Sequence, residues 1–471
     1  MSSCNAARLR NDAATVANSA ESVGTHGRGR KNDNPQFIRH FEVYENHNRN
    51  YYIWADQPPS NASEGVIFPG YQESTWSYDE VAESFYFHRF YDHQPDLKFA
   101  NPEVQEEIES IMGFWLELGI SGFRLDAAPF LIELKGTHPA GTHDPYRYLR
   151  GLRDVLSWRR GGTILLPEAN VSTEEFMKYF GDGDRMHMLF AFLINQYTFL
   201  ALARQDAEPL RCILETLPHI PPPSQWATFL RNHDELDLGR LSASEREEVF
   251  RAFAPQENMR LYARGIRRRL APMLNNDRRR IELAYALLFS IPGSPVIFNG
   301  EEIGMGEDLN LPERTAVRTP MQWSAEINGG FSQAPHYKLI RPAVKNGEYG
   351  YEHVNVTEQS RDPSSLLNRV RHILGARRAA PEFAWGEFSL IPADNSHVMA
   401  HRCDWRGNSV LALHNLSNEP CEVGIELEGE APKELTDVLS DKEYPAMIPT
   451  IRRVPLQPYG YRWLRLAGTR R

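Results

Sequence analysis

The sequence predicts an α/β fold of the (β/α)8 TIM-barrel type, followed by an all-β domain. Between residues 102 and 298, short apolar runs alternate with amphipathic helical patterns, which is typical of a parallel sheet covered by helices. Each apolar run ends in polar, chargeable residues, as expected of a barrel whose site lies at the carboxyl ends of its strands. Beyond Pro381 the pattern changes to short β runs, which predicts a β-sandwich.

The expected elements follow one another regularly. We predict helices at 102–118, 145–160, 172–180, 196–216, 279–291 and 361–380, and barrel strands at 122–127, 163–169, 188–194, 226–230 and 295–298. The first helix has Pro102 in its first turn, acidic residues at its start and Gly119 at its end. The sandwich strands are expected at 388–391, 410–413, 423–427 and 461–464.

Composition divides the chain into four segments. Residues 1–34 are rich in Ser, Asn, Ala, Gly and Arg, which predicts a disordered or loosely helical tail. Residues 35–100 are aromatic and irregular and are predicted to form an inserted loop domain with short strands, which walls a pocket. We assign residues 101–382 to the barrel and 383–468 to the sandwich.

Charge and cysteine content exclude several classes of protein. The net charge of −10 argues against a nucleic-acid partner. The four cysteines lack a CxxC or metal-ligand spacing, which indicates reduced thiols. No apolar run reaches 18 residues and no signal peptide is evident, so we expect a soluble cytoplasmic protein. The basic run 264–269, with 278–280 beyond it, is predicted to be a solvated helical face.

Three of the predicted strands lead into carboxylates. Arg124 and Asp126 are two residues apart, so both side chains would leave one face of a strand. A barrel spends about 31 residues on each βα unit. The separations of 42 residues from Asp126 to Glu168 and 66 from Glu168 to Asp234 therefore fit strands n, n+1 and n+3.

Carboxylates converging at strand ends suit the chemistry of glycosidic bonds. A retaining glycosidase needs a nucleophile and an acid/base about 5–5.5 Å apart. Arg124 would keep a neighbouring carboxylate ionised, and His233 would donate to a sugar hydroxyl. In the structural alternative, Arg124 and Asp126 form a buried ion pair, Glu168 is a surface carboxylate and Asp234 caps a loop.

Several motifs resemble the alpha-amylase family, glycoside hydrolase family 13. These are Gly122–Asp126, Glu168 at the end of its strand, Asn232–Asp234 and, as a fourth, Gln94–Leu97. Longer stretches resemble the members of this family that interconvert maltose and trehalose, namely 229–236, 265–272, 302–306, 317–323 and 362–368. The resemblance covers roughly residues 35–466.

The resemblance implies roles for individual residues. Asp126 would be the nucleophile, Glu168 the general acid/base and Asp234 the stabiliser of the transition state. Arg124, His233, Arg318 and Phe130 would bind the substrate.

The implied reaction is a retaining intramolecular glucosyl transfer between maltose and trehalose, with glucose released as a side product. Plain α-glucosidase activity is an alternative. The implied partners are these small sugars, without nucleic acid or membrane, and a homo-oligomer is one form considered. No cofactor is required. Calcium is possible, but no metal ligand is assigned, because the family's calcium site uses an Asn that is missing here.

The sequence also departs from the family pattern. The family begins with three βα units that residues 1–34 do not resemble, so we expect a barrel lacking its first three units. Such a chain could be a truncated or mis-started product, could be completed by a partner or another copy, or could be a non-catalytic carbohydrate-binding or assembly protein. Smaller departures are Lys98, Thr315-Ala316 and Pro167, which removes one donor from its strand.

Overall fold

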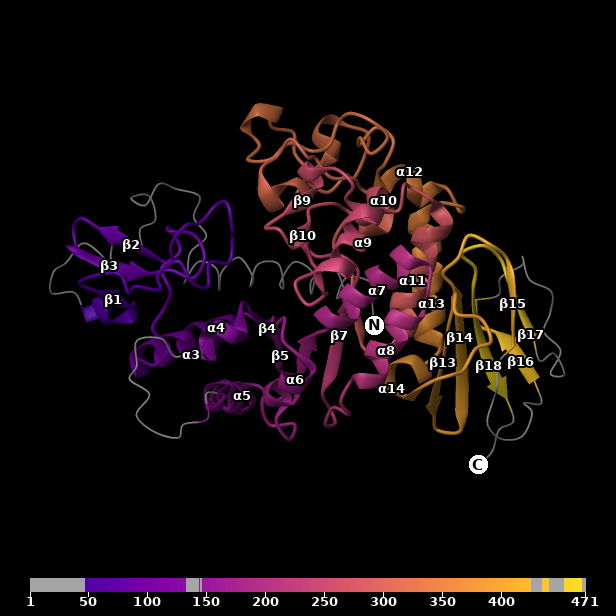
Figure 1. Ribbon diagram of the computed structural model, residues 1–471, viewed down its shortest axis with the longest axis horizontal. Coiled ribbons are helices and arrows are strands. Elements are labelled where there is room, and N and C mark those ends of the chain that lie inside the picture. The colour runs from indigo at the N-terminus through magenta and orange to yellow at the C-terminus, as the bar shows by residue number, and fades with distance from the viewer. Residues whose placement is uncertain (1–46, 133–143, 145, 425–433, 440–452, 468–471) are drawn as a thin grey trace. The chain divides into compact units, whose positions relative to one another are not determined.

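The computed structural model describes residues 47–132, 144, 146–424, 434–439 and 453–467 (Figure 1). The chain divides into two compact units. The first contains residues up to Phe190 together with Pro218–Gln225, and the second contains Ala191–Leu217 and the chain from Trp226 onward. The predicted tail, 1–34, lies outside the described residues.

The first unit begins with a small antiparallel sheet. A 3-10 turn, η1 His47–Tyr51, leads into strands β1 Trp54–Ala55, β2 Trp76–Asp79 and β3 Ser84–Phe87, which pair in the order β1–β3–β2. Aromatic pairs cross from β2 to β3, with ring centroids 5.4 Å apart for Trp76–Phe87 and 5.0 Å apart for Tyr78–Phe85. Such pairs stabilise a hairpin, and the three strands agree with the short strands predicted for this segment.

Helices and strands then alternate along the first unit. They are α3 Pro102–Glu117, β4 Gly122–Leu125, α4 Ala128–Ile132, α5 Arg147–Arg159, β5 Ile164–Pro167, α6 Thr173–Phe180 and β6 Met188–Phe190. Helix α3 begins as predicted, because Asn101 caps it by accepting from the Glu103 N–H and Pro102 occupies its first turn. It ends just before Gly119, which adopts a φ of 100°.

Strands β4 and β5 pair in parallel, with Gly122 opposite Ile164 and Leu125 opposite Pro167. A Cβ at Gly122 would lie 2.6 Å from the Ile164 carbonyl oxygen, so only glycine allows this close approach. The ladder continues past Pro167, since the Glu168 N–H donates to the Leu125 carbonyl at 2.8 Å. The register brings the ends of both strands to the same level.

The second unit repeats the α/β pattern. Strand β7 Gln225–Phe229 pairs in parallel with β11 Ser294–Val296. The helices are α7 Phe192–Arg204, α8 Glu208–Thr216, α9 Ala243–Phe253, α10 Leu270–Met273, α11 Arg278–Ser290, α12 Val356–Arg361, α13 Leu366–Ala379 and α14 Glu382–Trp385. A small antiparallel sheet follows β7 and consists of β8 Leu236–Asp237, β9 Arg260–Leu261 and β10 Gly265–Ile266.

Two predicted elements differ from the structure around α7. The single helix predicted over 196–216 is two helices, because Gln205 takes a left-handed φ of 55° and ends α7. The Asp206 side chain then accepts from the Glu208 N–H at the start of α8. The strand predicted over 188–194 is also too long, because α7 begins at Phe192; a short apolar run does not distinguish a strand from a buried helical turn. The helix predicted over 361–380 is α13, which begins only at Leu366, whereas Arg361 ends the separate short helix α12.

The predicted solvated helical face at residues 264–269 is wrong. Arg267 and Arg269 are buried and lie in the chain between β10 and α10. Arg269 pairs with buried Glu301 at 3.0 Å, and Arg267 donates to the Leu309 carbonyl at 2.9 Å. These guanidinium groups satisfy carbonyl and carboxylate oxygens of an irregular segment, which explains why so many arginines point inward.

The C-terminal part of the second unit is all-β, as predicted. Five strands form an antiparallel sheet, with β13 Val398–Trp405, β14 Asn408–Asn415 and β18 Tyr461–Ala467 at its centre and β12 Glu387–Leu390 and β16 Glu434–Asp437 at its edges (Figure 1). A second sheet pairs β15 Cys421–Gly424 with β17 Arg453–Leu456. One apolar cluster joins Leu411 and Leu464 of the first sheet to Val423 and Val454 of the second. The residues beyond Gly424 of the strand predicted at 423–427 lie outside the described part.

Two general expectations can be compared with the described residues. Cys212, Cys403 and Cys421 are free thiols. Within the described ranges, no helix combines the length and apolar character needed to cross a membrane.

Candidate active site

A single guanidinium bridges two carboxylates at the ends of β4 and β5. Arg124 Nη1 donates to Asp126 Oδ1 and Nη2 donates to Glu168 Oε2, each at 2.5 Å. Both acidic residues follow their strands directly, so the parallel register of β4 and β5 places them at one sheet edge. The two carboxylates are therefore only one guanidinium apart, as a pair of glycosidase carboxylates must be close together.

The three side chains differ in their exposure. Asp126 is 55% exposed, whereas Arg124 and Glu168 are 19% and 21% exposed. Asp126 is thus open to an incoming ligand, while Glu168 is held against the protein. This asymmetry suits an attacking carboxylate beside a partly buried proton donor.

A strained turn follows Asp126. Ala127 has a φ of 47°, a left-handed conformation that costs a non-glycine residue about 1–2 kcal/mol. Its N–H lies 3.4 Å from Glu168 Oε2, and the Ala128 N–H donates to the Glu168 carbonyl at 3.0 Å. The turn therefore fixes Glu168 through both its backbone and its side chain, just before α4 begins.

Phe130, predicted to bind substrate, lies on α4 in the same unit. Its ring meets Phe90 edge to face, with centroids 5.8 Å apart. The Arg89 guanidinium lies 4.6 Å from the centre of the same ring. Phe130 is thus packed against two residues that follow β3, at a position four residues beyond Asp126.

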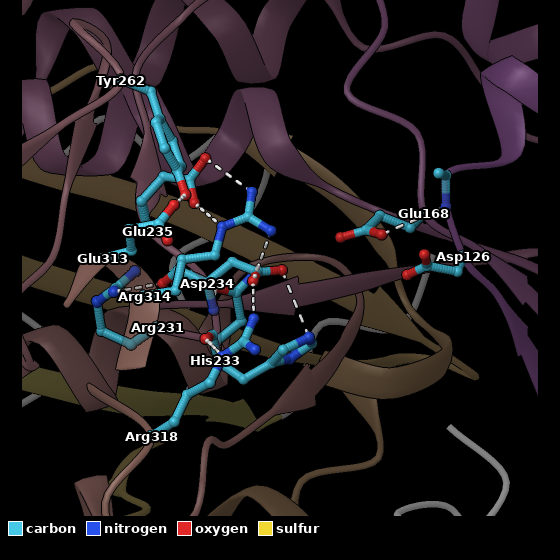
Figure 2. Close-up of polar contacts among 12 residues, drawn as sticks. Asp126, Glu168, Arg231, His233, Asp234, Glu235, Tyr262, Glu313, Arg314 and Arg318 are labelled. Carbon is cyan, nitrogen blue, oxygen red and sulfur yellow. Dashed lines mark hydrogen bonds and ion pairs between the residues drawn. The ribbon is translucent and has the colours of Figure 1, made fainter. Parts of the chain in front are cut away.

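Asp234 is the centre of a second charged cluster, in the second unit. Figure 2 shows its carboxylate surrounded by cationic side chains. Oδ1 accepts from Arg318 Nη2 at 2.5 Å and lies 3.1 Å from Arg314 Nη1, and Oδ2 lies 3.4 Å from His233 Nε2. Two fixed positive charges favour the ionised carboxylate. The side chain is 15% exposed, so Asp234 is held by side chains and does not act as a simple loop cap.

The backbone around Asp234 is held equally firmly. The Asn232 side chain accepts from the Asp234 N–H at 3.0 Å. Arg231 Nη2 donates to the Asp234 carbonyl at 2.8 Å, and Arg318 Nε donates to the His233 carbonyl at 2.7 Å. Burial lowers the pKa of Arg231 to about 10, which leaves it charged at neutral pH.

Arg314 links Asp234 to a buried neighbour. It donates to both carboxylate oxygens of Glu235, at 2.6 and 3.1 Å (Figure 2). The Tyr262 ring lies 5.5 Å from its guanidinium carbon, and the Tyr262 hydroxyl donates to Glu313 at 2.6 Å. Burial alone lowers the pKa of Arg314, but the charges of Asp234 and Glu235 outweigh burial and raise it.

The structure therefore brings the predicted residues together in two groups, one in each unit. Arg124, Asp126 and Glu168 form the first, and His233, Asp234 and Arg318 form part of the second. The sequence analysis missed Arg231, Glu235, Tyr262 and Arg314. The charged run 231–235 was visible, but nothing in the sequence pattern links it to Arg314.

Metal binding receives no support from side-chain clusters. Within the described ranges, no group of three or more His, Cys, Asp or Glu side chains could hold a metal ion. The expectation that calcium is dispensable stays a prediction.

Comparison with known protein families identifies the family to which the chain belongs. Residues 30–261 and 266–386 match the model of the alpha-amylase catalytic domain, and residues 407–465 match the C-terminal domain of sucrose hydrolase-like proteins. The chain belongs to the alpha-amylase family, as its motifs predict. The family match confirms a TIM barrel with an all-β C-terminal domain.

Individual proteins of known sequence or structure are also similar to this chain. The chain is 41% identical over 415 residues to the trehalose synthase of Thermus thermophilus, covering 88% of this chain but only 43% of that protein. It is 40% identical over 426 residues to the trehalose synthase/amylase of Mycobacterium tuberculosis, covering 88% of this chain and 70% of that protein. Among solved structures, an alpha-amylase from H. orenii superimposes with a TM-score of 0.70 at 22% identity, over 92% of this chain and 77% of that one.

Proposed function

We propose that this chain interconverts maltose and trehalose by retaining glucosyl transfer, with glucose as a side product. The observation that carries the proposal is the bridge from Arg124 to both Asp126 and Glu168. The similarity to trehalose synthases, at about 40% identity over most of this chain, supports the same substrates.

In the first step, an Asp126 oxygen would attack the anomeric carbon of the non-reducing glucose of maltose. Glu168 would give its proton to the glycosidic oxygen as the bond between that oxygen and the anomeric carbon breaks. The products of this step are a glucosyl ester on Asp126, a free glucose and an ionised Glu168. The high exposure of Asp126 supports its assignment as nucleophile.

In the second step, the freed glucose would turn and attack the ester through its own anomeric hydroxyl. Glu168 would take the hydroxyl proton, and the Asp126 carboxylate would leave as trehalose forms. Water attacking instead would give a second glucose. Two inversions at the same carbon retain the α configuration.

The contact between Arg124 and Glu168 places a condition on the first step. A guanidinium beside a carboxylate favours the ionised form, whereas a general acid must carry a proton. A bound sugar would therefore have to displace Glu168 from Arg124 and leave Arg124 on Asp126 alone. The two hydrogen bonds of Arg124 would thus separate the roles of the two carboxylates once substrate is present.

The second cluster would stabilise the transition state. Asp234 would oppose the positive charge that develops on the sugar ring. His233, whose side chain is 42% exposed, would donate to a sugar hydroxyl. Arg318 and Phe130 are proposed as further substrate contacts, and Arg314 as a positioning residue for Asp234.

We further infer that β4, β5, β6, β7 and β11 occupy positions four to eight of the barrel. The order of the family motifs along these strands supports this numbering. Strands one to three would then be supplied by a partner or a second copy of the chain. The segment boundaries at 34, 100 and 382, the cytoplasmic location and the homo-oligomer also stay predictions.

An α-glucosidase is the second candidate, because the exposure of Asp126 would admit water to the glucosyl ester. The test is to incubate the purified chain with maltose and to separate the products by chromatography, with Asp126→Asn as the blank. Trehalose in excess of free glucose supports the transferase. Glucose alone supports the glucosidase. No product above the blank would contradict both and favour the non-catalytic binding protein.

A further inference from the structure

The loop-domain sheet borders a cavity of about 550 Å³. This volume is in the range of small-molecule sites. Its lining includes Trp54, Asn61, Glu64, Trp76, Phe87 and Arg89. Neither Asp126 nor Glu168 belongs to the lining, so the cavity is a separate place on the first unit.

Aromatic rings form the apolar walls of the cavity. Trp76 of β2 meets Phe87 of β3 edge to face, with centroids 5.4 Å apart, and both positions are fixed by the pairing of the two strands. Trp54 of β1 donates its indole N–H to the Arg49 carbonyl at 2.9 Å, and the Arg49 guanidinium lies 4.7 Å from the centre of its ring. Because the indole N–H already has a partner, Trp54 adds mainly apolar surface to the wall.

Arg89 supplies a fixed polar group. Its backbone N–H donates to Asp96 at 3.0 Å, and its carbonyl accepts from the Gln72 side chain at 3.1 Å. Its guanidinium packs on Phe87 and Phe130, at 5.4 and 4.6 Å from the ring centres. This residue is buried, so its orientation is set by the fold before any ligand arrives.

A glycine in the loop between β1 and β2 lies against the Arg89 guanidinium. Gly65 has a φ of +75°, and a Cβ there would lie 2.9 Å from Arg89 Nη1. Any other residue would both strain the backbone and push against the guanidinium. Asn61 and Glu64 stand on the same loop, with their side chains 3.5 Å apart at the rim.

The polar groups indicate the chemistry of the ligand. Arg89 and Glu64 carry opposite charges, so the lining favours neither an anion nor a cation. The Glu64 carboxylate and the Asn61 amide are planar groups that can bind neighbouring hydroxyls. Aromatic rings offer an apolar surface against which the C–H face of a sugar ring can pack.

We propose that this cavity is a second binding site, for an uncharged monosaccharide or disaccharide. The site is independent of the proposed reaction, because none of the proposed catalytic carboxylates lines it. It lies next to α4, however, since Arg89 contacts both the cavity and Phe130.

Calorimetric titration with maltose, and separately with glucose, tests the proposal on the full-length Asp126→Asn chain, in which turnover is blocked. Adding Trp76→Ala should weaken one binding event roughly tenfold or abolish it, because a stacking wall is lost. The matched control adds Trp158→Ala, which removes a tryptophan of α5 that is 90% exposed and is not one of the residues that line the cavity. The control should bind both sugars as the parent does.

A second variant keeps the test decisive if Trp76→Ala fails to fold by circular dichroism. Asn61→Ala changes only an exposed loop residue and should weaken the same event several-fold. Isotherms of both cavity variants that match the Trp158→Ala control would overturn the proposal. Turnover of maltose by the Asn61→Ala chain without the Asp126→Asn change, measured separately, shows whether the proposed reaction survives in either case.

Discussion

Arg314 donates two hydrogen bonds to Glu235, from Nε to Oε2 at 2.6 Å and from Nη2 to Oε1 at 3.1 Å. The remaining nitrogen of the same guanidinium lies 3.1 Å from Asp234. The Glu235 side chain is 3% exposed, and Arg264 approaches it only to 3.8 Å. One arginine thus ties a buried carboxylate to the carboxylate that we propose stabilises the transition state.

Replacing Arg314 with Ala should therefore damage stability and activity together. It leaves the buried charge of Glu235 largely uncompensated, which we expect to cost about 3 kcal/mol, and it loosens Asp234, which should lower kcat by roughly a factor of 100. Arg314→Lys keeps the positive charge but cannot donate both hydrogen bonds to Glu235. Its stability and its turnover should lie between those of Arg314→Ala and those of the parent. Urea unfolding and maltose turnover measure both effects.

The control for this change is Arg361→Ala. Arg361 is 73% exposed and pairs with Glu358 on one helical turn, so its loss should change the unfolding free energy by no more than about 0.5 kcal/mol. If the Arg314→Ala protein is as stable and as active as the Arg361→Ala protein, the contacts of Arg314 with Glu235 and Asp234 support neither stability nor catalysis.

Gly122→Ala should separate the first pair of carboxylates. The new Cβ would meet the Ile164 carbonyl at 2.6 Å, so β4 and β5 would have to move apart and Arg124 could no longer bridge Asp126 and Glu168. We expect a loss of about 1–3 kcal/mol in unfolding free energy and a strong fall in turnover.

Gly151→Ala provides the matched change. Gly151 lies inside α5, with nothing within 4 Å of a new Cβ, so alanine should raise stability by up to about 1 kcal/mol and leave turnover intact. Equal effects of the two substitutions would refute the role given to the β4–β5 contact.

Two buried histidines should make the second unit sensitive to acid. His401 and His414 stack with ring centroids 5.8 Å apart, and His401 Nε2 lies 3.1 Å from the Ser290 carbonyl of α11. Burial lowers the pKa of His401 to about 4, and burial together with His401 lowers the pKa of His414 to about 3. Both rings are therefore neutral in the folded protein at pH 5.

The direction of the pH effect follows from these values. The unfolded chain takes up protons near pH 6.5, whereas the folded chain does so only near pH 4, so stability is complete above about pH 6.5 and falls as the pH is lowered. His401 alone should account for about 3 kcal/mol by pH 4. Urea unfolding between pH 7 and 4.5 should show a smaller loss for His401→Phe than for the parent. Exposed His219 is the control, since the unfolding free energy of His219→Gln should change with pH as that of the parent does. If His401→Phe shows the same pH dependence as the parent, the buried His401 does not cause the acid sensitivity.

Arg124→Lys should impair catalysis while leaving the fold intact. Lysine keeps one positive charge but cannot bridge two carboxylates with fixed geometry. The expected fall in kcat for maltose is roughly 10–100-fold, with a KM that changes much less. Unchanged kinetics in this variant would mean that the bridge does not organise the site.

The succession of helices and strands was largely predictable because their apolar periodicity is strong. The strand at Gly122–Leu125 and the helix at Pro102–Glu117 were predicted to within about two residues. The division of 196–216 at Gln205 was not, since a left-handed residue that is not glycine leaves no mark in composition. This missed boundary is thus a place where one backbone angle decides the structure.

The site was predictable only where its residues lie at strand ends. Asp126 and Glu168 could be paired because barrel spacing fixes their relative position. Arg314 could not, because it reaches Glu235 from a short 3-10 helix, Glu313–Val317, that no apolar periodicity marks. The burial of Arg267 and Arg269 could not be predicted for a related reason. Their partners are mostly backbone carbonyl oxygens, which every residue carries.

The central claim is that Asp126 becomes covalently bound to glucose, and one experiment tests it directly. The chain is incubated with a fluorinated glucosyl fluoride, which forms the glucosyl ester but slows its breakdown, and is then digested for mass spectrometry. We predict one glucosyl adduct on the peptide that contains Asp126, and none in Asp126→Asn. An adduct on another residue, or none in a preparation that still converts maltose, would contradict the account.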